Sequence, residues 1–427
     1  MNPTWLDTTI LALYGQGSTD DPSSDFLRVY VEPMWSTILN HFDGSDHREP
    51  LVVPVHSPAA SPTTFAGDDA DVLVFDMHLV QLIFALTLLV LMKAKAETVV
   101  PALSSIFAER LFLAGDLEAS ALMAAGSRIA VASNETIVLE KTNFDWVSAM
   151  CRAQIGFIIA HELAHLAFAK NPVLAANNLE EHRSLLRETI AFSHPAKAEH
   201  GSQKRIHEEL KESGYSLSSR THDAEGREQA EQPLSAAETW ELVSRDQDFM
   251  VEVMADHMAC IALLRTHRKT YSPGFLASVA MLAMHNLETL RYLDQFATDG
   301  YPSSIAKAPQ TSFWHSAVRA TALRQSLGLI AVTYAEEGEP GYPDSLPQLD
   351  DILSNLSRSH SDFVMKPLFY SIDFEAIARA YATGKPAIIV VTGDLISVHS
   401  LRKLLGFGAS SDHVIFTKYI NVAVAGD

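Results

Sequence analysis

The sequence predicts an α+β fold that is predominantly α-helical, and three observations support this. Apolar segments of helical length recur between residues 79 and 335, with turn-forming residues between them. A short β-branched run, VLVF at Val72–Phe75, precedes the first of these segments and predicts a strand. The tail from Pro386 onward has the pattern of strand, helix and strand. With 427 residues and 47% apolar composition, the chain can bury a large core.

Charge and cysteine content narrow the class of protein. The net charge of −20 argues against nucleic acid or an anionic membrane as the main partner. The two cysteines, Cys151 and Cys260, cannot form a disulfide framework, and we expect both to be small core residues. No basic residue precedes Arg28 and the start of the chain has no long apolar core, so no signal peptide is expected. These features favour a cytoplasmic protein.

The most apolar segment is LVQLIFALTLLVLM at Leu79–Met92. It has 14 residues, whereas a helix that spans a bilayer needs about 20. Asp76 lies just before it and can cap a helix. The segment therefore predicts a buried core helix, and a membrane-anchored protein is the alternative. Another helix is expected over Pro101–Leu113.

Further helices follow along the chain. The longest is expected to run from a capping box, TNFD at Thr142–Asp145, to Lys170, where Asn171-Pro172 ends it. Residues 171–234 are polar and charged, which is typical of a partly helical insertion. Helical sequence resumes at a second capping box, SAAE at Ser235–Glu238, and continues to about Thr266. Two more helices are expected over Pro273–Phe296 and Phe313–Ala335.

The segment FIIAHELAHLAFA places three polar side chains in an otherwise apolar helix. His161 and His165 are four residues apart, so both imidazoles project from one face and can bind one metal ion. Glu162 is rotated by about 100° from His161 and can reach a water bound to that ion. This HExxH arrangement is typical of zinc peptidases, in which the metal activates the water and the carboxylate takes its proton. The alternative is two hydrogen-bonded histidines with an unrelated glutamate.

A catalytic zinc site needs a third protein ligand. The apolar helix FMVEVMADHMAC carries Glu252 and Asp256, again four residues apart on one face. Glu252 can serve as the third ligand, and Asp256 can accept a hydrogen bond from a ligating imidazole. Two solvated acids on an amphipathic helix are the alternative interpretation, and His257 is the competing ligand.

HELAH followed by EVMAD on a separate helix resembles the gluzincin zinc metallopeptidases, in particular soluble relatives of the CAAX prenyl proteases and the Lit-type phage-exclusion peptidases. TTFAGDDADVLVFDMHLVQL at Thr63–Leu82 is similar to the edge strand and helix of that group, with Thr64 where an asparagine is usual. The resemblance implies a zincin-like core with a small edge sheet. It also implies one Zn²⁺ on His161, His165 and Glu252, with Glu162 as catalytic base and Asp256 behind the ligands.

The resemblance covers about residues 57–330 and suggests three parts: an N-terminal segment at 1–56, a metallopeptidase domain at 57–335 and a C-terminal α/β segment at 336–427. Family members often stabilise the oxyanion from a later helix, where FWHSAVRATAL offers His315 and Arg319. We take His315 as the oxyanion candidate, although it lacks the family's His-Pro pairing. Four histidines in the insertion are more typical of solvated residues than of a second metal site: His194, His200, His207 and His222.

These observations predict a zinc endopeptidase that hydrolyses peptide bonds in a protein or peptide substrate, with no nucleic-acid partner and no membrane contact. The insertion at 171–234 joins the two ligand-bearing helices, so we expect it to act as a lid. The alternative function is a non-catalytic zinc-binding sensor or interaction protein that keeps the fold. The presence of Glu162 favours catalysis, because a structural zinc site needs no base. The sequence leaves the oligomeric state and the substrate open.

Overall fold

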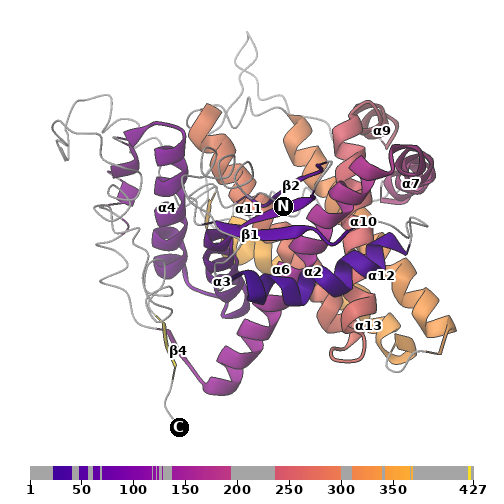
Figure 1. The fold of residues 1–427 in the computed structure, drawn as a ribbon. Coiled ribbons are helices and arrows are strands. Elements are labelled where there is room, and N and C mark those ends of the chain that lie inside the picture. The colour runs from indigo at the N-terminus through magenta and orange to yellow at the C-terminus, as the bar shows by residue number, and fades with distance from the viewer. Residues whose placement is uncertain are drawn as a thin grey trace, which may run out of the picture.

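The structure is a computed structural model that describes residues 23–40, 48–55, 61–67, 70–117, 119–121, 123–124, 127, 137–193, 236–299, 310–338, 342–365, 367–368 and 422–424. Helices dominate these residues, and a small sheet lies among them (Figure 1). The α+β, mostly helical class predicted from the sequence is therefore confirmed. The tail from Pro386 lies outside the described residues except for one short strand, and so do residues 194–235 of the predicted insertion.

The helices follow one another with short connections where the structure describes them. Their bounds are α2 (Ser23–Leu39), α3 (Met77–Leu91), α4 (Ala96–Leu113), α6 (Lys141–Lys170), α7 (Pro172–Ser193), α9 (Ala236–Ser244), α10 (Gln247–His267), α11 (Pro273–Asp299), α12 (Gln310–Glu336) and α13 (Tyr342–His360), the last followed by a π-helical turn, η2 (Ser361–Met365).

The small sheet has three strands, β1 (Leu51–Val55), β2 (Thr63–Phe65) and β3 (Val72–Asp76), in the order β1-β3-β2. β1 runs parallel to β3, and β2 runs antiparallel to it. β2 is thus an edge strand, and it contacts α6. Separately, β4 (Ile137–Leu139) pairs in parallel with β5 (Val422–Val424). The strand predicted from VLVF is β3, extended by Asp76.

Helix α6 lies at the centre of the fold and contacts α2, α3, α10 and α11. Most of its residues from Val147 to Phe168 are buried, which fits its almost continuous apolar sequence. Gly156 allows α2 to approach closely, because a Cβ at this position would lie 2.9 Å from Met34 Cε. The HELAH motif therefore lies on a helix that is packed on several sides, with His161 buried and Glu162 and His165 partly exposed.

Helix α3 contains the apolar segment Leu79–Met92, and it is a buried core helix as predicted. Its cap is Asp76, whose Oδ1 accepts a hydrogen bond from the His78 backbone N–H at 2.9 Å. Thr87, the polar residue in its middle, has partners in two other helices: Gln154 Nε2 and Asn286 Nδ2 donate to its Oγ1. Because these donors satisfy the hydroxyl, the helix can bury Thr87 at little cost.

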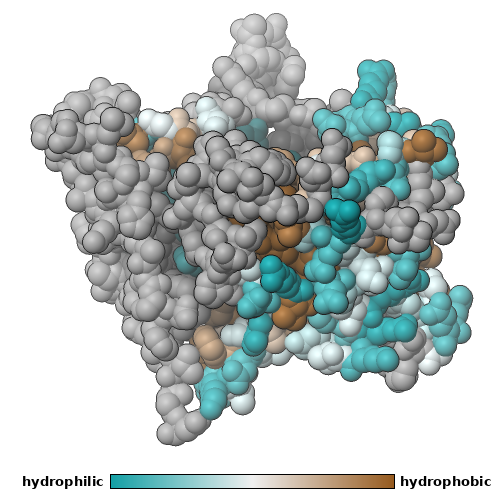
Figure 2. Space-filling model, viewed as in Figure 1, coloured by the Kyte–Doolittle hydropathy of each residue, from teal (hydrophilic) through white to brown (hydrophobic). Residues whose placement is uncertain are grey.

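The described helices include none that is long and apolar enough to cross a membrane. On the face shown in Figure 2, hydrophilic residues cover most of the described surface and apolar residues are visible near the centre. Cys151 and Cys260 are both free and buried, as the sequence predicted. Burial raises the pKa of the Cys151 thiol to about 12, so this side chain stays uncharged at neutral pH.

One predicted helix start and one predicted continuous helix differ from the structure. α6 begins at Lys141 with Glu140 as its cap residue, so the TNFD segment does not form a capping box. Helical sequence from Ala236 is broken at Arg245 and Asp246, where a new helix starts. The reason is local, since Asp246 Oδ1 accepts a hydrogen bond from the Phe249 N–H and caps α10. The predicted end of α6 at Lys170 is confirmed, and Pro172 begins α7, where proline is favoured.

Candidate metal centre

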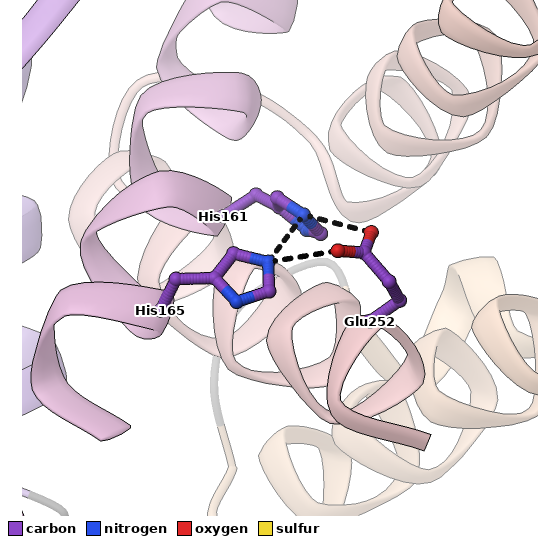
Figure 3. Close-up of side chains that lie close together, drawn as sticks. All are labelled: His161, His165 and Glu252. Carbon is purple, nitrogen blue, oxygen red and sulfur yellow. Dashed lines mark hydrogen bonds and ion pairs between the residues drawn. The ribbon is translucent and has the colours of Figure 1, made fainter. Parts of the chain in front are cut away.

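The two histidines of the HELAH motif face the same point. His161 and His165 lie one turn apart on α6, and their Nε2 atoms are 3.1 Å from each other (Figure 3). His161 is buried and His165 is partly exposed, with a side-chain exposure of 25%. The pair thus forms the inner wall of a site that solvent can reach from one side.

Glu252 on α10 brings a carboxylate to the same point. Its Oε2 lies 3.3 Å from His161 Nε2, and its Oε1 lies 3.2 Å from His165 Nε2. α6 and α10 make the most extensive contact between helices in the described fold, which fixes this arrangement. Among the described residues, His161, His165 and Glu252 form the group of side chains that could hold a metal ion.

The spacing of these atoms fits a tetrahedral ion. Ligand atoms about 2.0–2.1 Å from a zinc ion are separated from one another by about 3.3 Å in a tetrahedron. The two imidazole nitrogens are 3.1 Å apart, close to that value, and each of them lies 3.2 or 3.3 Å from a different oxygen of the Glu252 carboxylate. Two imidazoles and one carboxylate are also the donor set of a catalytic zinc site, which leaves the fourth position open.

Asp256 lies behind His161, on the next turn of α10. Its Oδ1 is 3.0 Å from His161 Nδ1. The oxygen lies off the direction of the ring N–H bond, so the contact is an ion pair rather than a well-formed hydrogen bond. This carboxylate still orients the ring so that Nε2 points to the site.

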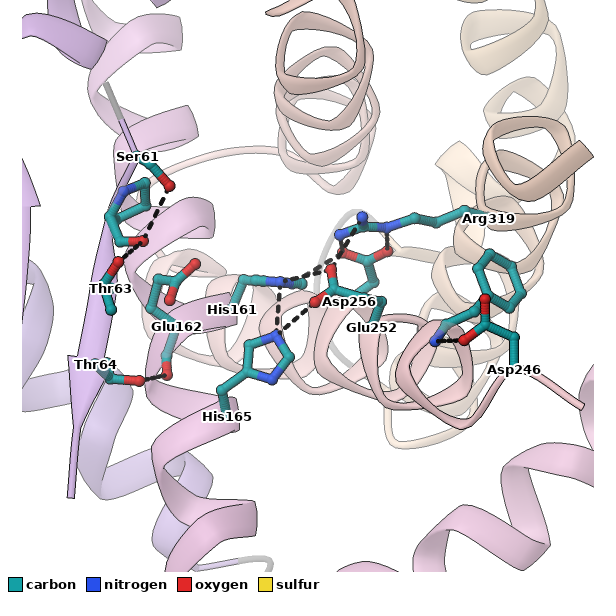
Figure 4. Close-up of polar contacts among 12 residues, drawn as sticks. Ser61, Thr63, Thr64, His161, Glu162, His165, Asp246, Glu252, Asp256 and Arg319 are labelled. Carbon is teal, nitrogen blue, oxygen red and sulfur yellow. Dashed lines mark hydrogen bonds and ion pairs between the residues drawn. The ribbon is translucent and has the colours of Figure 1, made fainter. Parts of the chain in front are cut away.

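Arg319 on α12 connects the two carboxylates (Figure 4). Its Nε and Nη2 donate to the two oxygens of Asp256, with Nη2 at 2.9 Å from Oδ1, and its Nη1 lies 3.0 Å from Glu252 Oε2. A guanidinium presents its donors in a planar fork, so this bidentate contact fixes the carboxylate in orientation as well as in position. The sequence suggested Arg319 only as a neighbour of His315, because nothing in it shows which carboxylates the guanidinium meets.

The charges of the site depend strongly on one another. Burial opposes a charge on His161, but Asp256 and Glu252 outweigh this and raise its pKa to about 10. Burial likewise opposes ionisation of Glu252, yet His161 and His165 hold its pKa well below the usual range. Arg319 and His161 lower the pKa of Asp256 against the effect of burial. The metal-free site is therefore ionised at neutral pH, with positive and negative groups paired.

Glu162 points away from the Glu252 side of the site. Its side chain lies between α6 and β2 in Figure 4, and its backbone carbonyl accepts a hydrogen bond from Thr64 Oγ1 at 3.4 Å. Burial raises the pKa of the Glu162 carboxyl, although His161 and His165 oppose the rise. A carboxyl whose pKa is raised toward neutrality is suited to take up and release a proton.

Some candidates from the sequence are not part of this group. His257 packs against His182 of α7, with ring centroids 4.7 Å apart, and does not belong to the group that could hold a metal. His315 lies within α12, but its side chain is outside the described part of the structure. His194, His200, His207 and His222 also lie outside it. The oxyanion role of His315 therefore stays a prediction.

A pocket of about 390 Å³ adjoins the site. Glu252, Asp256 and Arg319 form one wall of it, and further lining residues come from α6, α10 and α11. One candidate ligand, Glu252, thus lies at the edge of a space that can hold part of another molecule.

No family model, curated protein or solved structure matches this chain. The fold and the site define a mostly helical protein with a candidate metal centre between two helices. The resemblance to gluzincins rests on the HELAH and EVMAD motifs of the sequence and stays a prediction.

Proposed function

We propose that this protein is a zinc-dependent endopeptidase of the gluzincin type. The observation that supports it best is that His161 Nε2, His165 Nε2 and the Glu252 carboxylate lie close enough together to bind one metal ion. Two imidazoles and one carboxylate are the donor set of a catalytic zinc site with one open position. Bound there, zinc would act as a Lewis acid and lower the pKa of a water molecule to roughly 7.

The chain's own residues have complementary roles in this proposal. Glu162 holds and transfers the proton, because its side chain flanks the ligands and its pKa is raised by burial. Asp256 keeps the ring of His161 in place, and Arg319 keeps Asp256 and Glu252 in place. Edge strand β2 lies next to Glu162, and an extended peptide can pair with such an edge. Peptide bonds are for this reason the favoured substrate.

Zinc content and hydrolysis test the proposal together. We expect about one zinc per chain in the wild type and in Glu162→Gln, and loss of zinc in His165→Ala. Hydrolysis of a casein or a quenched fluorescent peptide pool should fall by roughly 10²–10⁴-fold in Glu162→Gln, because only the general base is removed. Absence of zinc from the wild-type protein after zinc loading would refute the proposal.

The second candidate is a zinc-binding sensor or interaction protein without catalysis. The ion pairs that Glu252 and Asp256 make with Arg319 favour it, because they tie the candidate ligands to α12 and would let metal binding alter that helix. The same measurements separate the two candidates. A protein that binds zinc but shows no hydrolysis, and no difference between wild type and Glu162→Gln, is the sensor.

A further inference from the structure

The pocket beside the candidate metal centre extends from Glu252 toward the N-terminal end of α10. Asp246, which marks that end, lies beyond Glu252 as seen from the two histidines (Figure 4). Phe157 lines the pocket one turn before His161 on α6, and Phe249 lines it three residues before Glu252 on α10. A molecule that reacts at the metal centre would place an adjacent group in this space.

The floor of the pocket is apolar. Phe157, Phe249 and Met284 line it, with exposed fractions of 1%, 6% and 4%, and the partly buried Leu287 continues this surface on α11. Such a floor favours a ligand with an aliphatic stem over a short polar one, since covering it removes apolar surface from water.

The rim of the pocket carries an excess of negative charge. Glu252 and Asp256 each pair with Arg319 and with His161. The other charged lining residues are three acids, Asp246, Asp248 and Glu288, and one base, Arg291. Asp246 caps α10 and Glu288 lies 3.7 Å from His285, but the acids still outnumber the base by three to one. A cleft with this balance attracts a cation and repels an anion.

We propose that this pocket selects a substrate with a lysine or arginine side chain next to the bond that is attacked. Both side chains combine an aliphatic stem, which would cover the apolar floor, with a cationic end, which would reach the acidic rim. This inference rests on the proposed function, because the pocket and the metal centre share Glu252. It goes beyond that function by naming the class of side chain that the site accepts.

Binding of hydroxamates to the zinc-loaded full chain tests the proposal without relying on turnover. Acetohydroxamate, which has no side chain, reports on the metal centre alone. Nα-acetylated hydroxamates of lysine, norleucine and glutamate then compare a cationic, a neutral and an anionic end, with an uncharged alkyl stem of similar length in norleucine. We expect the lysine compound to bind roughly three- to tenfold more tightly than the norleucine compound, and the glutamate compound most weakly.

Variants assign this preference to the rim. Glu288→Gln and Asp248→Asn should each reduce the ratio of lysine to norleucine affinity. Asp351→Asn is the matched control, because it removes the same charge from an exposed position on α13 outside the pocket lining and should leave the ratio unchanged. Equal affinity of the three side chains, or a ratio that the rim variants do not alter, would overturn the pocket proposal while acetohydroxamate binding leaves the metal centre intact. If acetohydroxamate itself does not bind and the protein takes up no zinc, the proposed function fails, and the pocket proposal fails with it.

Discussion

Arg319 should contribute more to the stability of the metal-free protein than an ordinary surface arginine does. It makes a bidentate contact with Asp256 and a 3.0 Å contact with Glu252. In Arg319→Ala, the two carboxylates would keep the contacts with His161 but lose their strongest cationic partner. Asp256 would be the residue most affected, because only 4% of its side chain is exposed.

The size of this loss of stability depends on how deeply the paired side chains are buried. Breaking a fully buried ion pair by removing one partner costs about 3–5 kcal/mol. Here the side chains of Arg319 and Glu252 are 25% and 38% exposed, so water would partly solvate the remaining carboxylate. We therefore expect Arg319→Ala to lower the free energy of unfolding by about 2–3 kcal/mol.

The same helix offers a matched control. Arg324 also lies on α12, but it contacts Asp350 at 3.6 Å, and the side chain of Asp350 is 76% exposed. A surface pair of this kind is worth about 0–1 kcal/mol. Arg324 Nη2 also donates to Ser354 Oγ at 3.0 Å, a neutral partner, so Arg324→Ala should cost about 1 kcal/mol and clearly less than Arg319→Ala.

Urea denaturation in the presence of a chelator, monitored by circular dichroism, measures the unfolding free energies of both variants. Arg319→Lys should fall between wild type and Arg319→Ala, because an ammonium keeps the charge but not the planar fork. Equal losses in Arg319→Ala and Arg324→Ala would refute the argument that the paired carboxylates depend on this guanidinium.

Three further predictions follow from the same contacts. Zinc binding at pH 7 should release about one proton from His161, whose pKa is raised to about 10 in the metal-free site, and calorimetry in two buffers with different ionisation enthalpies counts it. In the metal-free protein, protonated His161 should stabilise the fold fully below its unfolded-state pKa of about 6.5 and lose this contribution as the pH rises through about 10, so His161→Gln should flatten the pH dependence of stability over that range. Asn286→Ala should cost about 1–3 kcal/mol of unfolding free energy without changing zinc content, because Asn286 Nδ2 donates to buried Gln154 at 2.9 Å and this network lies apart from the ligands; a variant that loses zinc would contradict the separation.

Local patterns explain the parts of the fold that were predicted correctly. Leu79–Met92 is apolar on all sides, which is compatible only with burial or a membrane, and its length decides for burial. Asn171-Pro172 ends α6 because proline disfavours a helical conformation in the residue before it. Such signals depend on a few neighbouring residues and need no knowledge of the rest of the chain.

The two helix boundaries that were predicted wrongly also have a local cause, because in each case another residue takes the cap position. TNFD has the composition of a capping box, but the chain enters α6 two residues earlier, where Glu140 takes the cap position without a side-chain hydrogen bond. The helical sequence from Ala236 to Thr266 contains Asp246. Its carboxylate accepts a hydrogen bond from the Phe249 N–H, and a new helix starts there. Cap residues occur inside helical patterns as well as at their ends, so composition alone does not place the boundary.

For the candidate site, the sequence alone determined which residues could share one face of one helix. The spacing of four residues put His161 with His165, and Glu252 with Asp256, because α-helical geometry is the same in every protein. Only the tertiary structure decided that α6 and α10 bring these faces to within about 3.3 Å of each other. It also decided that Arg319, more than 60 residues after Asp256, joins the two carboxylates and that a pocket opens beside them. Contacts of this kind depend on how whole helices pack, and packing is set by the many buried side chains that the helices share rather than by the few that form the site.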